Sequence, residues 1–205
     1  MTYRTLYKTW LSSEKVGEGL QVEIVAPPAD TVVSVAEAKE FCRVDFDKDD
    51  DLILRIIKAV TGTAEAFSNR AFLTQSIQAY WETVRDYVVL PRPPHRTVTL
   101  VESSTGGSWT TLAASEYQLS GLHTLKIRPR KSFSVSGSAE MQFRVAFEAG
   151  YGDHPEDVAD AIKQAILDSV RFQYDNRGVL SADTLPICGT LTPLSKSLLQ
   201  PFVAY

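Results

Sequence analysis

The segment VDFDKDDDLILRIIKAV holds the densest group of side chains that could do chemistry, with five aspartates within seven residues. Carboxylates this close together can bind a hard cation such as Ca²⁺, transfer protons, or occupy the start of a helix. Asp45, Asp47 and Asp49 match the first three ligand positions of a calcium-binding EF-hand loop. The same loop requires Gly where this chain has Asp50, and a bidentate acid where it has Ile56. The spacing therefore argues against a calcium site.

The acidic residues fit better as the beginning of a helix. Acids at a helix start accept from free backbone N–H groups and interact favourably with the helix dipole, each worth about 0.3–1 kcal/mol at an exposed end. Asp47 or Asp49 would be the N-cap, and a long amphipathic helix is predicted over residues 49–69. Its apolar face is formed by residues at helical spacing, namely Ile53, Ile56, Ile57, Val60, Ala64 and Phe67.

The rest of the chain has no local catalytic or metal-binding motif. His95, His123 and His154 have no His or Cys partner at metal-ligand spacing. No nucleophile elbow, phosphate loop or dinucleotide-binding pattern is present. Cys42 and Cys188 lie far apart and form no paired-ligand motif. The sequence therefore predicts a protein without catalytic residues, metal or cofactor.

Composition places the chain among soluble globular proteins, because 44% of its residues are hydrophobic and 22% are charged. The formal net charge of −4 argues against a broad basic face for duplex DNA. The N-terminus has no apolar h-region, and no apolar run approaches membrane-spanning length. We expect a soluble protein made in the cytoplasm, with no membrane partner.

Two further segments have strong helix signals. Ser34 and Glu37 form a capping-box pattern that predicts a helix over residues 34–43. Pro155 in a first turn, with Asp153 and Glu156 as a second capping box, predicts a long helix over residues 155–176. Near the C-terminus, Leu194, Leu198 and Leu199 suggest one short amphipathic helix before Pro201.

Residues 75–148 lie between the second and third predicted helices. There the hydrophobic residues recur at every second position, not at helical spacing. Ile77, Ala79 and Trp81 alternate with polar residues, and so do Met141, Phe143, Val145 and Phe147. The segment QVEIVAPP reads as another short strand, closed by two prolines. An antiparallel β region is therefore predicted between helices.

These patterns predict an α+β fold, a small helical bundle with an inserted antiparallel β region. The bundle has two N-terminal helices, one long later helix and a short C-terminal helix. We expect an N-terminal arm (1–30), a main domain (31–180) and a C-terminal tail (181–205). An aromatic-rich terminus without its own core usually packs against another surface. Arm contacts are therefore expected from Tyr3, Tyr7 and Trp10, which together with Leu6 could line one side of a short helix.

The order of these pieces resembles the head–tail connector, or adaptor, proteins of tailed bacteriophages and gene transfer agents. The resemblance begins in VSVAEAKEFCRVDFDKDDD, where a short helix and an Arg-Val-Asp with acids precede a longer amphipathic helix. It continues with Arg70, Ala71 and Gln75 leading into a strand, LPRPP, FEAGYG before a helix, and LLQPF near the end. No single motif is specific, but their joint order is, over residues 33–204.

The resemblance implies a structural subunit without catalysis. Such proteins assemble as a ring, typically of twelve subunits, beneath the portal protein at the head–tail junction of the virion. The ring joins the portal to stopper or tail proteins and forms part of the conduit through which DNA slides without sequence-specific binding. A negative chain suits such a conduit. Alternatives are a head-completion (stopper) or tail-terminator protein of the virion neck, and an enzyme with a dispersed site.

Family members use the C-terminal segment to grip the portal. The low-charge tail of this chain would be poorly satisfied by solvent, so we expect docking through Leu194, Leu198, Leu199, Phe202 and Tyr205. If these residues serve a partner only, removing the residues after about Pro193 should leave the fold nearly intact and impair docking.

Overall fold

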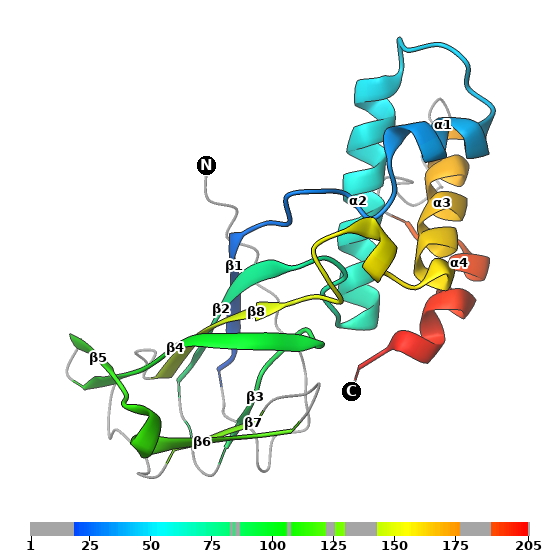
Figure 1. The fold of residues 1–205 in the computed structure, drawn as a ribbon. Coiled ribbons are helices and arrows are strands. Elements are labelled where there is room, and N and C mark those ends of the chain that lie inside the picture. The colour runs from blue at the N-terminus through cyan, green and yellow to red at the C-terminus, as the bar shows by residue number, and fades with distance from the viewer. Residues whose placement is uncertain are drawn as a thin grey trace. The chain divides into compact units, whose positions relative to one another are not determined.

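A computed structural model describes residues 19–82, 84, 87–105, 108–121, 126–129, 143–176 and 190–204. Its contacts divide the chain into a helical unit, residues 29–73 and 151–205, and a β unit, residues 1–28 and 74–150. The predicted α+β class, with an antiparallel β region inserted between helices, is confirmed (Figure 1). The predicted division at residues 30 and 180 differs from these units, because the C-terminal segment packs with the earlier helices and the segment before residue 28 pairs with the sheet.

The first helices of the helical unit begin and end close to where the sequence predicts. Helix α1 (Val35–Cys42) has the predicted capping box: Glu37 N–H donates to Ser34 Oγ at 3.1 Å, and Ser34 N–H donates to Glu37 Oε2 at 2.7 Å. These hydrogen bonds lower the pKa of Glu37, the backbone bond from Ser34 contributing most. Helix α2 (Asp50–Ser68) ends at Asn69, whose φ of 51° stops the helix in the left-handed region.

Helix α3 begins later than predicted. Residues Pro155–Asp157 form a separate 3₁₀ turn, and α3 spans Asp160–Asp175. The predicted capping role of Glu156 is taken by Asp157. The His154 N–H group, just before the turn, donates to Asp157 Oδ2 at 3.1 Å. The two segments are separate because Val158 adopts an extended conformation (φ −93°, ψ 134°) and is buried in the helical core.

Short C-terminal helix α4 (Pro193–Leu199) forms as predicted and continues into a 3₁₀ turn, Gln200–Phe202. Thr192 is its N-cap and accepts from Ser195 N–H at 3.0 Å. Pro193 occupies the first helical position, where a missing N–H group costs nothing.

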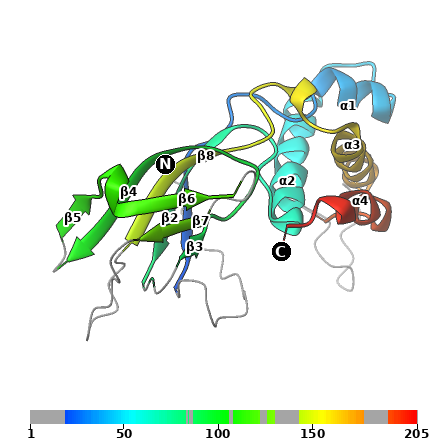
Figure 2. The same cartoon turned by 60° about the horizontal axis from the view of Figure 1, so that its bottom comes forward.

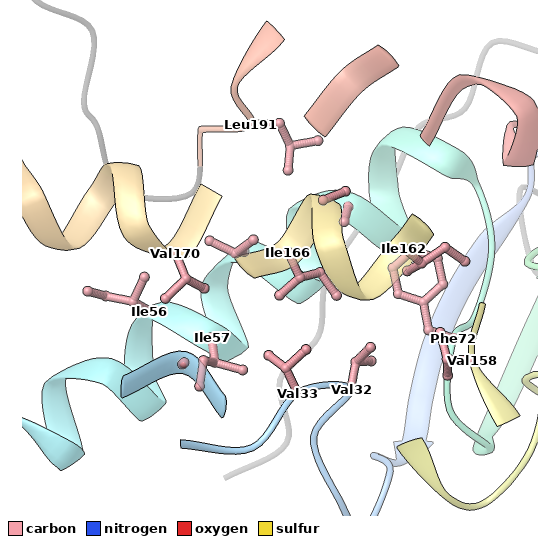
Figure 3. Close-up of a cluster of buried hydrophobic side chains, with 14 of the residues drawn as sticks. Val32, Val33, Ile56, Ile57, Phe72, Val158, Ile162, Ile166, Val170 and Leu191 are labelled. Carbon is pink, nitrogen blue, oxygen red and sulfur yellow. The ribbon is translucent and has the colours of Figure 1, made fainter. Parts of the chain in front are cut away.

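The core of the helical unit is formed by one face of each helix and by the segments that precede them (Figure 3). The apolar residues at helical spacing in α2 are buried, as predicted, with Phe67 partly so. Helix α3 contributes Ile162, Ile166 and Val170, and Val32 and Val33 enter from the loop before α1. Cys42 packs against this core, and its burial raises the pKa of its thiol.

The β unit contains two antiparallel sheets, which lie close together in both views (Figures 1 and 2). The five-stranded sheet has the order β1-β2-β8-β4-β5 and the three-stranded sheet the order β3-β7-β6. The strands are β1 (Gln21–Ala26), β2 (Gln75–Trp81), β3 (Val88–Val89), β4 (His95–Thr105), β5 (Ser108–Thr111), β6 (Tyr117–Ser120), β7 (Lys126–Pro129) and β8 (Phe143–Ala149).

Central strands β2 and β8 show the predicted alternation. Ile77, Ala79 and Trp81 are buried on β2, and Phe143, Val145 and Phe147 are buried on β8. The register places Trp81 opposite Phe143 and Ile77 opposite Phe147, so both apolar sets line one face. Met141, predicted to continue this face, lies outside the described residues.

Strand β1 corrects the predicted N-terminal arm. Residues 21–26 were expected to form a strand within the arm, and they pair antiparallel with β2 at an edge of the five-stranded sheet. Residues 21–24 are half-buried and residues 25–26 are exposed, as suits a strand at the edge of a sheet. The predicted arm residues Tyr3, Tyr7 and Trp10 lie outside the described residues.

Candidate partner-docking site

The acidic segment before α2 is held by side chains from two other helices. Lys39 Nζ, on α1, lies 2.6 Å from Asp47 Oδ1 and 2.8 Å from Asp50 Oδ1. Asp49 is the N-cap as predicted, but its carboxylate makes no capping bond and accepts from Tyr174 of α3 at 2.7 Å. The aspartates therefore join the start of α2 to α1 and α3, a tertiary role that the sequence alone did not predict.

This cluster predicts a pH dependence of stability. The hydrogen bond from Lys39 lowers the pKa of Asp47, so folding favours the ionised carboxylate. The resulting stabilisation is present above the unfolded-state pKa of about 3.9 and is lost as pH falls through the lower folded-state pKa. Lys39→Gln should therefore lower the urea midpoint at neutral pH, and the two midpoints should converge below about pH 4.

The matched control is Lys58→Gln, which changes an exposed lysine of α2. Urea unfolding is followed by far-UV circular dichroism across the acid range. A difference between Lys39→Gln and the natural chain that stays constant down to about pH 2 would contradict the role of the Asp47 carboxylate.

A buried polar network fixes α4 on α3. Ser195 Oγ donates to the Ala165 carbonyl at 2.7 Å and lies 2.8 Å from Ser169 Oγ. Both serines are fully buried. The Asp168 carboxylate accepts from the Thr192 hydroxyl, and its Oδ2 lies 3.1 Å from Ser195 Oγ. Since buried hydroxyls need partners, this network determines where α4 lies along α3.

Removing one hydroxyl from this network should destabilise the helical unit. Ser195→Ala leaves the Ser169 hydroxyl and Ala165 carbonyl with fewer partners, at a cost of about 1–3 kcal/mol. Ser197→Ala on the exposed side of the same helix is the control, expected within about 0.5 kcal/mol of the natural chain. Equal effects of the two substitutions on urea unfolding would contradict a structural role of the network.

The chain after α4 returns to the end of α2. Ala204 N–H donates to the Ser68 carbonyl at 2.9 Å, and Asn69 donates through its side chain to the Ala204 carbonyl at 3.3 Å. Arg70 donates through Nε to the Phe202 carbonyl. The C-terminal segment is therefore part of the helical unit along most of its described length.

The residues predicted to dock on a partner have different surroundings. Leu199 is fully buried in the core of the helical unit, which corrects its predicted role as a surface residue. Leu198 and Phe202 are partly buried and pack against the same core. Leu194 is 55% exposed, and Tyr205 lies outside the described residues. Among the predicted docking residues that the structure describes, Leu194 is thus the most exposed.

Leu194 lies in a groove of about 510 Å³ on the helical unit. Phe172 of α3 is 44% exposed and lines the same groove, together with Phe41, Pro193 and Thr192. Large exposed apolar side chains gathered in one concave place are typical of binding surfaces.

The charged residues of the groove are Asp168, Arg171 and Asp175. Arg171 Nε lies 3.6 Å from Asp175 Oδ2, and the guanidinium carbon lies 6.0 Å from the centre of the Phe41 ring. Two acids face one base, so the lining has a small negative excess.

Sequence reasoning missed Phe172 and Phe41 as surface residues. A detectable signal was present for Phe172, because it lies off the helical face that Ile166, Val170 and Tyr174 bury. A large aromatic outside the apolar stripe of an amphipathic helix indicates a contact beyond the helix's own core. The groove itself had no sequence signal, because α1, α3 and α4 meet there only in the fold.

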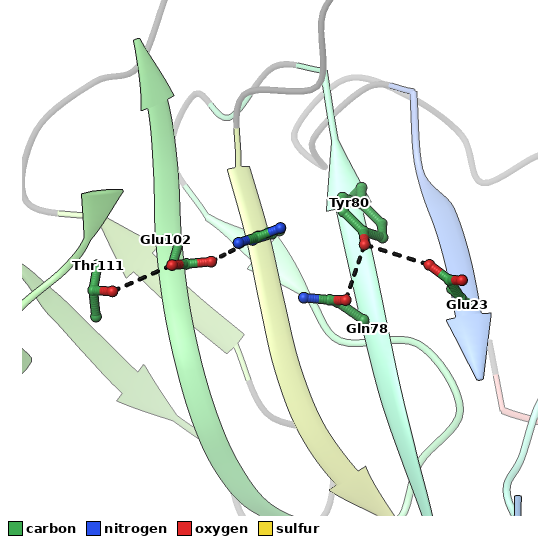
Figure 4. Close-up of polar contacts among 6 residues, drawn as sticks. Glu23, Gln78, Tyr80, Glu102 and Thr111 are labelled. Atoms are coloured by element: carbon green, nitrogen blue, oxygen red, sulfur yellow. Dashed lines mark hydrogen bonds and ion pairs between the residues drawn. The ribbon is translucent and has the colours of Figure 1, made fainter. Parts of the chain in front are cut away.

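A second candidate surface is a polar ladder across the five-stranded sheet (Figure 4). Tyr80 donates to Gln78 Oε1 at 2.9 Å and lies 3.4 Å from Glu23 Oε2 (Figure 4). Arg144 pairs with Glu102, and its guanidinium carbon lies 4.4 Å from the centre of the Trp109 ring.

Members of this ladder are directly opposite one another on neighbouring strands, Tyr80 with Arg144 and Arg144 with Glu102. Burial raises the pKa of Tyr80, so its hydroxyl stays protonated at neutral pH. Because these groups already bond to one another, the ladder stabilises strand pairing, and the groove is the better candidate for a partner.

The described residues contain no group of three or more His, Cys, Asp or Glu side chains placed to hold a metal ion. Across the same part of the chain, no helix is both long and apolar enough to cross a bilayer.

Among protein families, residues 32–102 match the phage gp6-like head-tail connector proteins. The matched segment covers α1, α2, β2, β3 and most of β4. No curated protein matches the sequence significantly.

Solved structures share the fold at low sequence identity. A chain in the neck of an empty gene transfer agent (GTA) particle computed with C6 symmetry has a TM-score of 0.71 and 18% identity, covering 90% of this chain and 96% of that one. A chain of the native GTA virion has a TM-score of 0.69 and 20% identity, with 90% and 95% covered. A chain from the native GTA neck, computed with C12 symmetry, has a TM-score of 0.65 and 19% identity. The match covers 90% of this chain and 96% of that one.

The helical unit with its inserted antiparallel sheets is thus the fold that this chain shares with these gene transfer agent proteins. The family match over residues 32–102 confirms the resemblance to head–tail connector proteins that was found in the sequence.

Proposed function

We propose that this chain is a structural subunit of the virion neck, where it connects head and tail of a phage or gene transfer agent particle. The observation that carries the proposal is the connector-family match over residues 32–102, supported by a fold shared along 90% of the chain with proteins of the GTA neck. Its place is the head–tail junction of the virion. The function is structural, and no catalytic step is assigned to it.

The subunit would act as a homo-oligomeric ring. The similar GTA necks were computed with C6 and C12 symmetry, which supports a ring of twelve copies for this chain as well. One side of the ring would contact the portal protein and the other the stopper or tail proteins. DNA would pass through the lumen, for which a net charge of −4 avoids strong attraction to phosphate.

Portal docking would use the C-terminal segment. Leu199 is part of the core, so the docking residues that remain are Leu194, Leu198, Phe202 and Tyr205. Leu194 contributes most to this proposal, because 55% of its surface is exposed within the described part of the chain.

A deletion experiment tests the function. Particles produced without this chain are expected to accumulate heads and tails separately, and expression of the chain from a plasmid should restore joined particles. Joined, infective or transducing particles in the absence of the chain would overturn the proposal. Electron microscopy of the separated structures measures the outcome directly.

Portal docking needs its own measurement. Size-exclusion chromatography of the purified chain with portal protein should show a complex, which Leu194→Asp abolishes. Val25→Asp is the matched control, since Val25 is 60% exposed and lies on β1. Equal retention of the complex by both variants would exclude Leu194 from docking. A complex with tail proteins, and none with portal, would indicate a stopper or tail terminator.

A further inference from the structure

The two units of the chain have formal charges of opposite sign. The helical unit has 16 acidic and 10 basic residues, a net charge of −6, and the β unit has 9 acidic and 11 basic residues, a net charge of +2. Together they give the −4 of the whole chain. Complementary charges on exposed surfaces direct association and fix its register, so copies of this chain have a basis for contacting one another through unlike units.

The three-stranded sheet (Figure 2) has one basic face. Side chains alternate along a strand, so Lys126 and Arg128 of β7 lie on the face opposite to that of Ile127, which is fully buried. Both bases are exposed, and Lys126 Nζ lies 5.3 Å from the centre of the Tyr87 ring. Strands β3, β6 and β7 contain no Asp or Glu within their described bounds. With Tyr87, the two bases therefore form a face without acids of its own, which we call the basic sheet face.

The segment that connects α1 to α2, residues 43–49, presents an aromatic side chain among acids. Phe46 is 47% exposed and stands between Asp45 and Asp47, which are exposed as well. The segment is fixed, because the carboxylates of Asp47 and Asp49 bond to side chains of α1 and α3. A side chain on a fixed segment loses little conformational freedom on binding. Since phenylalanine is also enriched at the cores of protein interfaces, Phe46 has the properties of an anchor residue.

We propose that the basic sheet face binds the connecting segment, residues 43–49, of a second copy of this chain. Phe46 of one copy lies against Tyr87 of the other, and the acids beside Phe46 pair with Lys126 and Arg128. Each copy offers one surface of each kind, so the contact is heterologous, repeats from copy to copy and can close into a ring. The inference rests on the homo-oligomeric ring of the proposed function and identifies the surfaces that join its subunits.

Nucleic acid matches the basic sheet face less well. Strong duplex binding depends on Lys and Arg contacts to several phosphates, whereas this face has two exposed bases on β7. The whole chain is also negative, at −4, which opposes the approach of phosphate. An acidic segment with a large apolar side chain fits both the bases and the aromatic ring of the face.

Disulfide trapping between two different full-length variants tests the contact. One variant carries Lys48→Cys and the other Ser120→Cys, both with Cys42 and Cys188 replaced by alanine, so a 48–120 bond forms only between two chains. Lys48 is exposed beside Asp47, and Ser120 is exposed directly opposite Lys126. The matched control replaces the second variant by Ser108→Cys, an exposed serine on β5 of the same unit. Circular dichroism and thermal unfolding establish that all variants fold like the natural chain.

The expected result is a 48–120 bond that forms several-fold faster than the 48–108 bond, since docking raises the effective concentration of the thiols. Adding Phe46→Ser to the first variant should lower this rate several-fold, because it removes the apolar anchor. Adding Lys126→Glu and Arg128→Glu to the second should do the same, because acids then face acids. Lys196→Glu, a charge reversal of an exposed lysine on α4, is the control and should leave the rate unchanged.

A second measurement uses the natural chain, so the test does not depend on the cysteine variants. Chains labelled with ¹⁵N are mixed with unlabelled chains and treated with a carbodiimide. Mass spectrometry should then find Lys126 joined to Asp45 or Asp47 in peptides that combine one labelled and one unlabelled chain. Such mixed peptides show that the contact is between copies.

Both measurements are made on the purified chain and on purified particles. Equal trapping rates at Ser120 and Ser108 in both preparations, together with no mixed Lys126 peptide, would overturn the contact. A duplex oligonucleotide bound by the natural chain and lost with Lys126→Glu and Arg128→Glu, at equal trapping rates, would assign the face to nucleic acid and also overturn it. A fast 48–120 bond, with joined particles still formed in the absence of the chain, would support the contact and overturn only the neck function.

Discussion

Leu199→Ala is expected to lower the free energy of unfolding of the helical unit by about 2–5 kcal/mol, the range for truncating a buried leucine. Leu199 is fully buried within the core of this unit. The substitution removes apolar contacts with the core and leaves a cavity that the surrounding helices fill only partly. Urea unfolding followed by far-UV circular dichroism measures the loss.

Leu194→Ala is the matched control, because it makes the same chemical change near the other end of the same helix. Leu194 is 55% exposed, so its truncation should change stability by no more than about 0.5 kcal/mol. Equal destabilisation by the two substitutions would contradict the orientation of α4.

Because Leu199 is part of the core, we now expect removal of the residues after Pro193 to destabilise the fold. From the sequence alone, the fold was expected to stay nearly intact. A chain that ends at Pro193 loses Leu199, the hydrogen bond from Ala204 N–H to the Ser68 carbonyl, and the bond from Arg70 to the Phe202 carbonyl. Such a chain should unfold at lower urea concentration than the Leu199→Ala variant. A docking experiment with a truncated chain would therefore report loss of folding together with loss of binding.

Glu102→Ala is expected to destabilise the β unit by about 2–3 kcal/mol, because it removes a bond between charged groups and leaves Arg144 without that partner. The Glu102 side chain is only 10% exposed, and it also accepts from Thr111 at 3.2 Å. Since Arg144 is 25% exposed and stacked on Trp109, water replaces part of the lost interaction, which keeps the estimate below the cost for a fully buried pair. Tryptophan fluorescence reports this unit, where Trp81 and Trp109 lie.

Glu23→Ala on edge strand β1 is the control, because its carboxylate makes a longer contact, 3.4 Å from the Tyr80 hydroxyl. Its cost should stay within about 1 kcal/mol. A double-mutant cycle of Glu102→Ala with Arg144→Ala isolates the coupling between them. Additive effects in that cycle would contradict the pair as a source of sheet stability.

The C-terminal segment thus contributes both to the core and to the surface of the helical unit. Residues 190–204 complete the core of the helical unit through Leu191 and Leu199, and they present Leu194 to solvent. Substitutions meant to affect only the core or only the surface must therefore be chosen by the side of α4 on which they lie.

Local signals in the sequence predicted most elements correctly. The Ser34 capping box, the stop of α2 at Asn69 and the alternation of Phe143, Val145 and Phe147 all depend on residues close together in the chain. The start of α3 was misplaced for a different reason. Burial of Val158 in the core outweighed the local helix signals at Pro155 and Glu156.

The candidate site could be predicted only in part. The apolar composition of α4 indicated a contact, but nothing local distinguishes Leu194 from Leu199 as the exposed residue. Ser195 decides between them, since its hydroxyl must meet the Ala165 carbonyl and Ser169 on α3. Phe172 lines the groove together with Leu194, a residue distant from it in the chain that only the fold brings near.

By itself the sequence determined the α+β class, the caps and periods of the main elements, and the ordered motifs that resemble those of head–tail connectors. Only the tertiary structure decided that the aspartates before α2 serve to join helices, that strand β1 belongs to the sheet, and that Leu199 belongs to the core. The physical reason is the range of the interactions: capping and periodicity depend on neighbours within a few residues, whereas burial and ion pairing depend on segments that meet only in the folded chain.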